Sequence, residues 1–345
     1  MTTSIGEMEK TYVSTTKQRI EGSKFDWMMT AACTWLLTGA YLDAWAHNHI
    51  PSLETFFNPW HGVLYSGLLV VAMVMGSVLV INHARGNSWQ QAVPASYELS
   101  LLEIFGFAIG GVGDMFWHIL FGFERNIDAE LSPTHLMLMI SLGLIMAGPL
   151  RAAWRRSKTT LKAQVAAPHS LPFLLLLLLL VFTVLTQAAN PFNTLWPTDT
   201  LKTQITEQTL AMVSIVLQTI ILMGLILLTI RKWHLPFGFL TLVFTLNAMA
   251  LSVMHNHYII ILIAALAGVI ADVIYLRLQP SMARVGEFRL FACLVPGVLY
   301  LVYFLVLLVT SHIVWSVHLA VGSIILAGIT GWLLSYLFVP LRDSM

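Results

Sequence analysis

Two stretches of this sequence repeat one set of residues whose side chains can bind a metal. In each stretch an Asp is followed four residues later by a His, and a second His lies beyond a polar loop. The first set is Asp43, His47 and His61, and the second set is Asp114, His118 and His135. Imidazole and carboxylate together suit zinc, iron and copper. The two sets therefore predict either one metal supported by Asp–His pairs or two metals with one set each.

The spacing within each set predicts how helices position it. Residues four apart lie on one face of a helix, so Asp43 and His47 can address one centre. The second His of each set ends the motif Asn58-Pro59-Trp60-His61 or Ser132-Pro133-Thr134-His135. A polar N-cap followed by Pro is a typical helix start. We therefore expect each set to join the end of one helix to the first turn of the next.

The composition is that of an integral membrane chain. Of 345 residues, 57% are hydrophobic and 10% are charged, whereas about a quarter are charged in an average soluble domain. Apolar runs long enough to cross a bilayer predict about ten transmembrane helices. Their expected ranges are 25–45, 60–82, 97–120, 134–150, 170–189, 208–230, 236–254, 257–276, 290–311 and 314–338. The expected fold class is all-α, with helices 1–2 and 3–4 forming a parallel internal repeat.

The distribution of Lys and Arg predicts the orientation, because these residues stay on the cytoplasmic side. With the N-terminus inside, sixteen of the eighteen fall on that side, and only Arg125 and Lys202 lie outside. Both termini are then cytoplasmic in an inner or plasma membrane, and the two Asp/His sets face the extracytoplasmic side. The expected organisation is a polar tail over 1–24, a four-helix unit over 25–150 that carries the sets, a basic linker over 151–169 and a six-helix unit over 170–345.

Nine of the twelve His map to the outer ends of the expected helices. Five of these nine lie outside the two sets and are candidate additional ligands: His49, His255, His257, His312 and His318. The alternative for each Asp–His pair is a purely structural role, in which the two side chains pair with each other and satisfy the polar groups at a helix end.

Other acidic residues are candidate proton carriers or ligands. Glu103 lies eleven residues before Asp114, three turns along the same face, and is a candidate proton relay together with Asp272. The alternative is that both are packed polar groups. The remaining acidic residues of the outer loops are expected to be solvated charges: Glu54, Glu124, Asp128 and Glu130.

The first set resembles the copper-binding motif of the C subunit of the copper membrane monooxygenases, the particulate methane and ammonia monooxygenases. The resemblance rests on Asp43, on His47 four residues later and on His61 after thirteen intervening residues, and it covers about twenty residues of 345. It implies copper at these three residues and oxidation of a small apolar substrate from the bilayer. The second set has a longer gap before its last His and departs from that family's pattern.

These observations predict a membrane metalloprotein whose outward-facing site binds copper or iron, with zinc as an alternative, for redox or oxygenase chemistry. The expected partners are the bilayer, the metal ion and either other membrane subunits or an electron donor. Two other functions stay open: a metal-ion or proton transporter that uses the same outer site, and a haem-binding electron carrier. The two Cys suggest neither a disulfide framework nor a thiolate site. The chain has no basic domain and no glycine-rich phosphate motif, which argues against nucleic acid and nucleotide partners.

Overall fold

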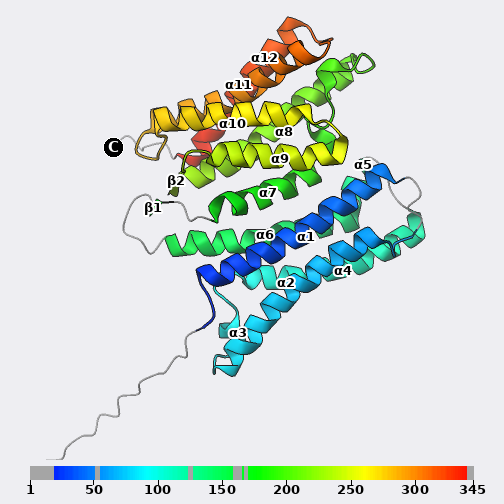
Figure 1. The fold of residues 1–345 in the computed structure, drawn as a ribbon, viewed down its shortest axis with the longest axis vertical. Helices are drawn as coiled ribbons and strands as arrows, with labels where there is room; N and C mark the ends of the chain where they lie inside the picture. The colour runs from blue at the N-terminus through cyan, green and yellow to red at the C-terminus, as the bar shows by residue number, and fades with distance from the viewer. Residues whose placement is uncertain (1–18, 51–54, 123–126, 158–164, 167–169, 340–345) are drawn as a thin grey trace, which may run out of the picture.

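The computed structural model describes residues 19–50, 55–122, 127–157, 165–166 and 170–339, and within them the chain is built from helices (Figure 1). The long helices are α1 (Ser23–His49), α2 (Pro59–Ala84), α4 (Glu98–Phe121), α6 (Pro133–Ser157), α7 (Leu171–Leu185), α8 (Ile205–Ile230), α9 (Phe239–His255), α10 (Ile259–Leu278), α11 (Val285–Thr310) and α12 (Val317–Phe338). Four short elements lie in the connections: α3 (Trp89–Ala92), α5 (Ile127–Leu131), η1 (Gln187–Ala189) and η2 (Trp196–Thr198). The strands β1 (Val165–Ala166) and β2 (Trp233–His234) form one short parallel pair.

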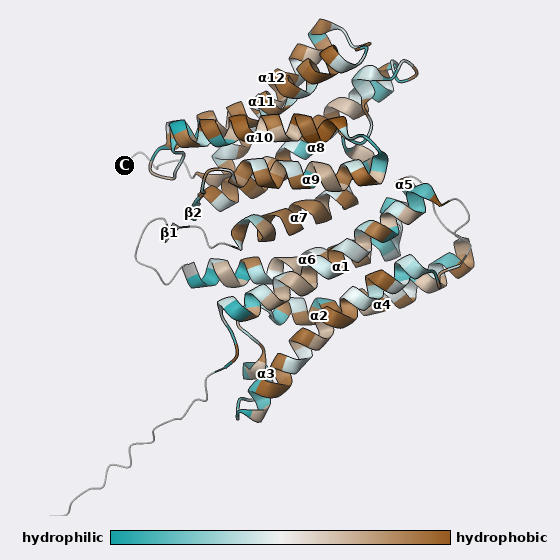
Figure 2. Ribbon diagram, in the orientation of Figure 1, coloured by the Kyte–Doolittle hydropathy of each residue, from teal (hydrophilic) through white to brown (hydrophobic). Residues whose placement is uncertain are grey.

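In the part of the chain that the structure describes, seven helices are long and apolar enough to cross a bilayer. These helices are α2, α4, α6, α8, α10, α11 and α12. The helices α7 and α9 are apolar but shorter, and α1 is long but contains three Thr, three Trp and one Tyr. Large apolar side chains stay exposed on the helix faces, such as Leu102, Ile119 and Leu308 at 63%, 69% and 65%, and hydrophilic residues gather toward the helix ends (Figure 2). The chain is therefore a multi-pass integral membrane protein.

Each of the ten expected helix ranges overlaps one of the ten long helices. The helical fold class is confirmed, with the two-residue strand pair as a small addition. Seven of the helices meet the length and apolarity of a membrane span, so the ten-span topology stays a prediction. The orientation also stays a prediction, and residues 1–18 and 340–345 lie outside the described ranges.

Consecutive helices pack as neighbours: α1 with α2, α4 with α6, α9 with α10, and α11 with α12. The long helices lie side by side across the longest axis of the molecule (Figure 1). Helix α1 also contacts α6, α7 and α9, and α2 contacts α4. The two helix pairs that carry the Asp/His sets are therefore adjacent.

Two glycines let α1 and α2 approach backbone to backbone. A Cβ atom on Gly39 would lie 2.6 Å from the Cα atom of Leu64, and one on Gly67 would lie 2.5 Å from the Cα atom of Leu36. Small residues permit this close packing of membrane helices. The contact holds the end of α1 against the start of α2, where the first Asp/His set lies.

A third glycine controls the contact between α2 and α4. A Cβ atom on Gly111 would lie 2.6 Å from the hydroxyl oxygen of Tyr65. The Tyr65 ring also packs edge-on against Phe107, with 6.4 Å between the ring centroids. The missing side chain at Gly111 therefore lets α2 lie close to α4.

A buried carboxylate ties the opposite end of the bundle together. Asp26 of α1 is 3% exposed and accepts a hydrogen bond of 2.8 Å from the Tyr97 hydroxyl, just before α4. Its other oxygen pairs with the guanidinium of Arg156 at the end of α6. The Asp26 carboxylate is buried whereas the Arg156 side chain is 45% exposed, so this contact favours the observed order of α1, α4 and α6.

Substituting Gly67→Ala should lower the unfolding temperature, because the new Cβ would collide with backbone of α1. Overpacking of this kind costs about 1–3 kcal/mol. The matched control is Gly76→Ala in the same helix, since a Cβ there meets nothing within 4 Å and Ala favours a helix. Thermal unfolding of both variants in one detergent checks this. Equal unfolding temperatures would contradict the proposed role of the glycine contact.

Candidate metal centre

The first Asp/His set assembles where α1 ends and α2 begins. Oδ2 of Asp43 is 3.7 Å from Nε2 of His47, and Oδ1 of Asp43 is 3.3 Å from Nε2 of His61. Asn58 caps α2 as predicted, because its side-chain oxygen accepts a 2.9 Å hydrogen bond from the N–H of His61. The cap fixes His61 in the first turn of α2, facing Asp43.

The second set is built in the same way from α4 and α6. Asp114 is 2% exposed, and its Oδ2 and Oδ1 lie 3.2 Å from Nε2 of His118 and 3.2 Å from Nε2 of His135. Oδ1 also accepts a 2.8 Å hydrogen bond from the hydroxyl of Thr134. The Ser132 hydroxyl caps the start of α6 by accepting from the N–H of His135 at 3.4 Å. The predicted cap is thus confirmed, and each set forms one Asp/His/His triad.

The two triads lie against each other. The ring centroid of His118 is 6.4 Å from that of His47, 6.5 Å from that of His61 and 5.6 Å from that of His135. The helix ends that carry these side chains are on one side of the molecule (Figure 1). Six potential ligands from four helices therefore form one cluster.

The hydrogen bonds of two rings define which nitrogen faces each carboxylate. Nδ1 of His61 is 2.6 Å from the carbonyl oxygen of Phe56, and Nδ1 of His118 is 3.3 Å from that of Gly122. A carbonyl only accepts, so each Nδ1 carries a proton, and in the neutral ring Nε2 presents a lone pair. That lone pair faces a carboxylate oxygen, and buried Oδ1 of Asp43 accepts no hydrogen bond from the described residues. Two acceptors 3.2–3.3 Å apart need a cation, either a proton or a metal ion.

The separations fit a metal ion. Ligand atoms bound at about 2.0–2.2 Å stand roughly 3.0–3.4 Å apart around a tetrahedral or octahedral ion. The nitrogen–oxygen separations in the triads are 3.2–3.7 Å, and all ligand atoms within a triad lie within 4.8 Å of one another. Among the described residues, only these two triads bring three or more His, Cys, Asp or Glu side chains within such reach. Each triad can therefore hold a metal ion with three protein ligands.

Three of the additional candidate ligands lie at a different place. His49 stacks on Trp45 and places its Nε2 3.1 Å from the side-chain amide nitrogen of Asn256, at the end of α9. His255 and His257 flank Asn256 in the sequence, and His255 is near His49. Burial lowers the pKa of His257. These residues form a second polar group between α1 and α9, which we call the His49 cluster.

The remaining candidates have contacts of other kinds. His312 and His318 are exposed around the turn between α11 and α12. Glu103 accepts a 2.7 Å hydrogen bond from Ser141 of α6. Asp272 accepts hydrogen bonds from the N–H groups of Leu240 and Thr241 and from the Thr241 hydroxyl, which caps the start of α9. The contacts of Asp272 favour a structural role over proton transfer.

One of the loop carboxylates was predicted wrongly. Glu54 and Glu124 lie outside the described residues, and Asp128 is exposed as expected. Glu130 is partly buried, and its Oε1 accepts a 2.9 Å hydrogen bond from the N–H of Ala188 in η1. Burial raises the pKa of Glu130 to about 7. Its exposure was overestimated because the loop composition does not reveal that α5 folds against η1.

Two aromatic residues of the site were missed from the sequence. The Phe56 ring lies 4.6 Å from the His61 ring and 6.4 Å from the His118 ring, so it covers both triads. The Tyr65 ring lies 6.2 Å from that of His61. The signal for Tyr65 was its position four residues after His61 on one helix face. Phe56 lies in a loop, where no periodicity marks it.

No protein-family model, curated protein or solved structure matches this chain. The resemblance to the copper motif is supported at the level of an Asp/His/His triad among apolar helices.

Stability should fall as the pH rises through about 7, because folded Glu130 retains its proton up to that pH whereas the unfolded residue loses it near 4.5. The contribution of protonated Glu130 to the free energy of unfolding is fully present below about pH 4.5. Glu130→Gln keeps the acceptor for Ala188 and removes the charge, so its unfolding temperature should change less between pH 5 and 8. Paired thermal scans across this range provide the test, and parallel curves for both proteins would contradict it.

Proposed function

We propose that this chain is a membrane metalloprotein with a two-metal centre, one ion in each Asp/His/His triad. The observation that supports it best is the pair of Nε2 atoms, from His61 and His118, that face carboxylate oxygens at 3.3 and 3.2 Å. Such pairs need a cation, and the ring contacts between the triads make the two sites neighbours.

Copper or iron suits this ligand set, with zinc as the alternative. Imidazole and carboxylate ligands with open positions support redox and oxygenase chemistry when copper or iron is bound. The resemblance of the first triad to a monooxygenase copper motif points the same way. We therefore favour oxidation of a small or lipid-soluble apolar substrate, with electrons from a donor or a partner subunit.

The residues of this chain have separate tasks in that proposal. The two Asp and four His would hold the ions, and the carbonyl groups of Phe56 and Gly122 orient two of the rings. Phe56 and Tyr65 pack against the cluster and would limit access of water to it. Burial of Asp114, His118 and His61 at 2%, 6% and 4% exposure strengthens every charge interaction there.

The proposed location of the centre is the extracytoplasmic side of a plasma or inner membrane. The support is the positive-inside distribution, in which sixteen of eighteen Lys and Arg map to the cytoplasmic side of the expected topology. The bilayer is then the medium from which an apolar substrate arrives.

The structure gives less support to the two other functions. A transporter that passes ions inward through Asp272 would need free carboxylate oxygens, and both accept hydrogen bonds from the start of α9. A haem carrier would need room for a porphyrin between two His, but the four triad His rings face carboxylates at 3.2–3.7 Å.

Protein purified in mild detergent without chelators should contain two metal ions per chain. His47→Ala and His118→Ala should each lose at least one ion, because each removes one of three ligands from a triad. His318→Ala is the matched control, since this His is exposed and outside the triads, and it should keep both ions. Elemental analysis measures the content, and unfolding temperatures check that the variants fold.

Metal content equal to wild type in both triad variants would contradict the proposal. Folded wild-type protein that takes up neither copper, iron nor zinc in equilibrium dialysis would contradict it as well. Copper or iron would direct the next assay to oxidation of alkanes or alkyl alcohols, and zinc would exclude the redox part of the proposal.

A further inference from the structure

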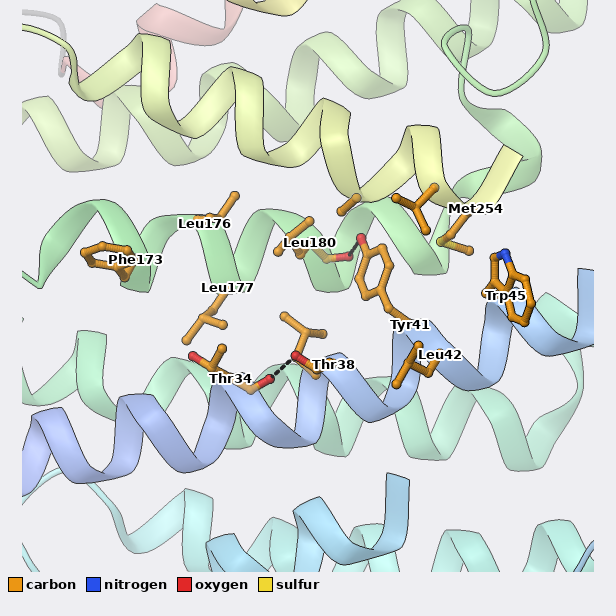
Figure 3. A pocket seen from close by; sticks show the side chains of 13 residues that line it. Thr34, Thr38, Tyr41, Leu42, Trp45, Phe173, Leu176, Leu177, Leu180 and Met254 are labelled. Carbon is orange, nitrogen blue, oxygen red and sulfur yellow. Dashed lines mark hydrogen bonds between the residues drawn. The ribbon is translucent and has the colours of Figure 1, made fainter. Parts of the chain in front are cut away.

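A narrow apolar cavity of about 290 Å³ lies between α1, α7 and α9 (Figure 3), and its lining on α1 includes neither Asp43 nor His47. Its lining on α1 extends from Thr34 to Trp45, which at 1.5 Å per residue is roughly 16 Å. Phe173 lies at one end, and Trp45 and Met254 lie at the other (Figure 3). The cavity is therefore a slot parallel to the helices.

The hydroxyl groups that line the slot already donate hydrogen bonds to backbone carbonyl groups. Thr34 donates to the carbonyl of Thr30, Thr38 donates to that of Thr34, and Tyr41 donates across the slot to that of Leu180. The other lining residues are apolar. A ligand with polar groups along its length would lose hydrogen bonds to water or lipid headgroups and would form no replacement hydrogen bonds in the slot. The slot therefore favours a hydrocarbon chain.

Polar groups occur beside the end of the slot that Trp45 and Met254 line. Met254 of the lining is followed by His255, whose Nε2 is buried and has no hydrogen-bond partner among the described residues. Trp45 of the lining stacks on His49, and His49 contacts Asn256. The His49 cluster therefore offers hydrogen-bonding groups where the apolar lining ends.

The slot is open along one side. Four of its lining residues are exposed: Thr34, Thr38, Phe173 and Val253. In a membrane this side faces lipid, so a hydrophobic molecule can enter laterally without crossing water. The enclosure by three helices leaves room for one chain.

We propose that the slot binds a single-chain amphiphile, such as a fatty acid or a long-chain alcohol. Its hydrocarbon chain lies along α1 from Trp45 toward Phe173, and its polar head hydrogen-bonds to the His49 cluster, including Nε2 of His255. The binding does not require the metal centre, whose α1 residues Asp43 and His47 are not part of the lining.

Quenching of tryptophan by bromine tests the position of the chain. Dodecanoic acid brominated beside the carboxyl group should quench Trp45, measured as the difference between wild type and Trp45→Phe. The same acid brominated at its terminal carbon should instead quench a Trp placed at the far end by Phe173→Trp in the Trp45→Phe background. Both signals should saturate as the acid is titrated into protein in unbrominated lipid nanodiscs.

Two variants separate slot binding from general partition into lipid. Ala250→Phe fills the slot and should weaken saturable quenching at least tenfold. Ala108→Phe places the same side chain on an exposed position of α4 and should change nothing. His255→Ala should weaken binding of the acid severalfold while leaving the unfolding temperature near that of wild type.

Quenching that rises without saturation, or that is the same in Ala250→Phe and wild type, would overturn the proposal. So would saturable quenching by brominated phospholipid that the free acid fails to displace, because the slot would then hold a bilayer lipid. Equal quenching at both ends by either brominated acid would overturn the proposed direction of the chain.

Discussion

The candidate centre depends on one electrostatic constraint, which is that a partly buried carboxylate and a buried carboxylate, Asp43 and Asp114, each face two imidazole nitrogens. Asp43 and Asp114 each have two imidazole Nε2 atoms within 3.7 Å. Backbone carbonyls hold the Nδ1 protons of His61 and His118, so these rings cannot turn without losing a hydrogen bond. Without a cation this arrangement repels itself in a medium of low dielectric constant. A bound metal ion would replace this repulsion between imidazole nitrogens and carboxylate oxygens with attraction of both to the ion.

The helix contacts maintain these distances. Gly39 and Gly67 bring α1 and α2 to backbone contact, and Gly111 lets Tyr65 lie against α4. The caps at Asn58 and Ser132 then place a His in the first turn of α2 and of α6. The site is thus built where helices end, and carbonyl groups at those ends are available to orient the rings.

The sequence predicted what depends on local spacing. The Asp-x-x-x-His pairs, the capped His and the helix ranges all follow from the helical period and from capping chemistry. Rotation of helices about their axes is decided by distant contacts, which no local pattern reports. For that reason the cap formed by Asp272 and the ion pair between Asp26 and Arg156 were not foreseen.

The most direct test of the central claim is the magnetic interaction between two bound Cu²⁺ ions. Protein loaded with two equivalents should show a half-field electron paramagnetic resonance signal, since the His47 and His118 ring centroids are only 6.4 Å apart. Asp43→Asn should remove that signal and leave the spectrum of one isolated copper. Two ions without magnetic coupling, or a single site that Asp43→Asn does not affect, would contradict a two-metal centre.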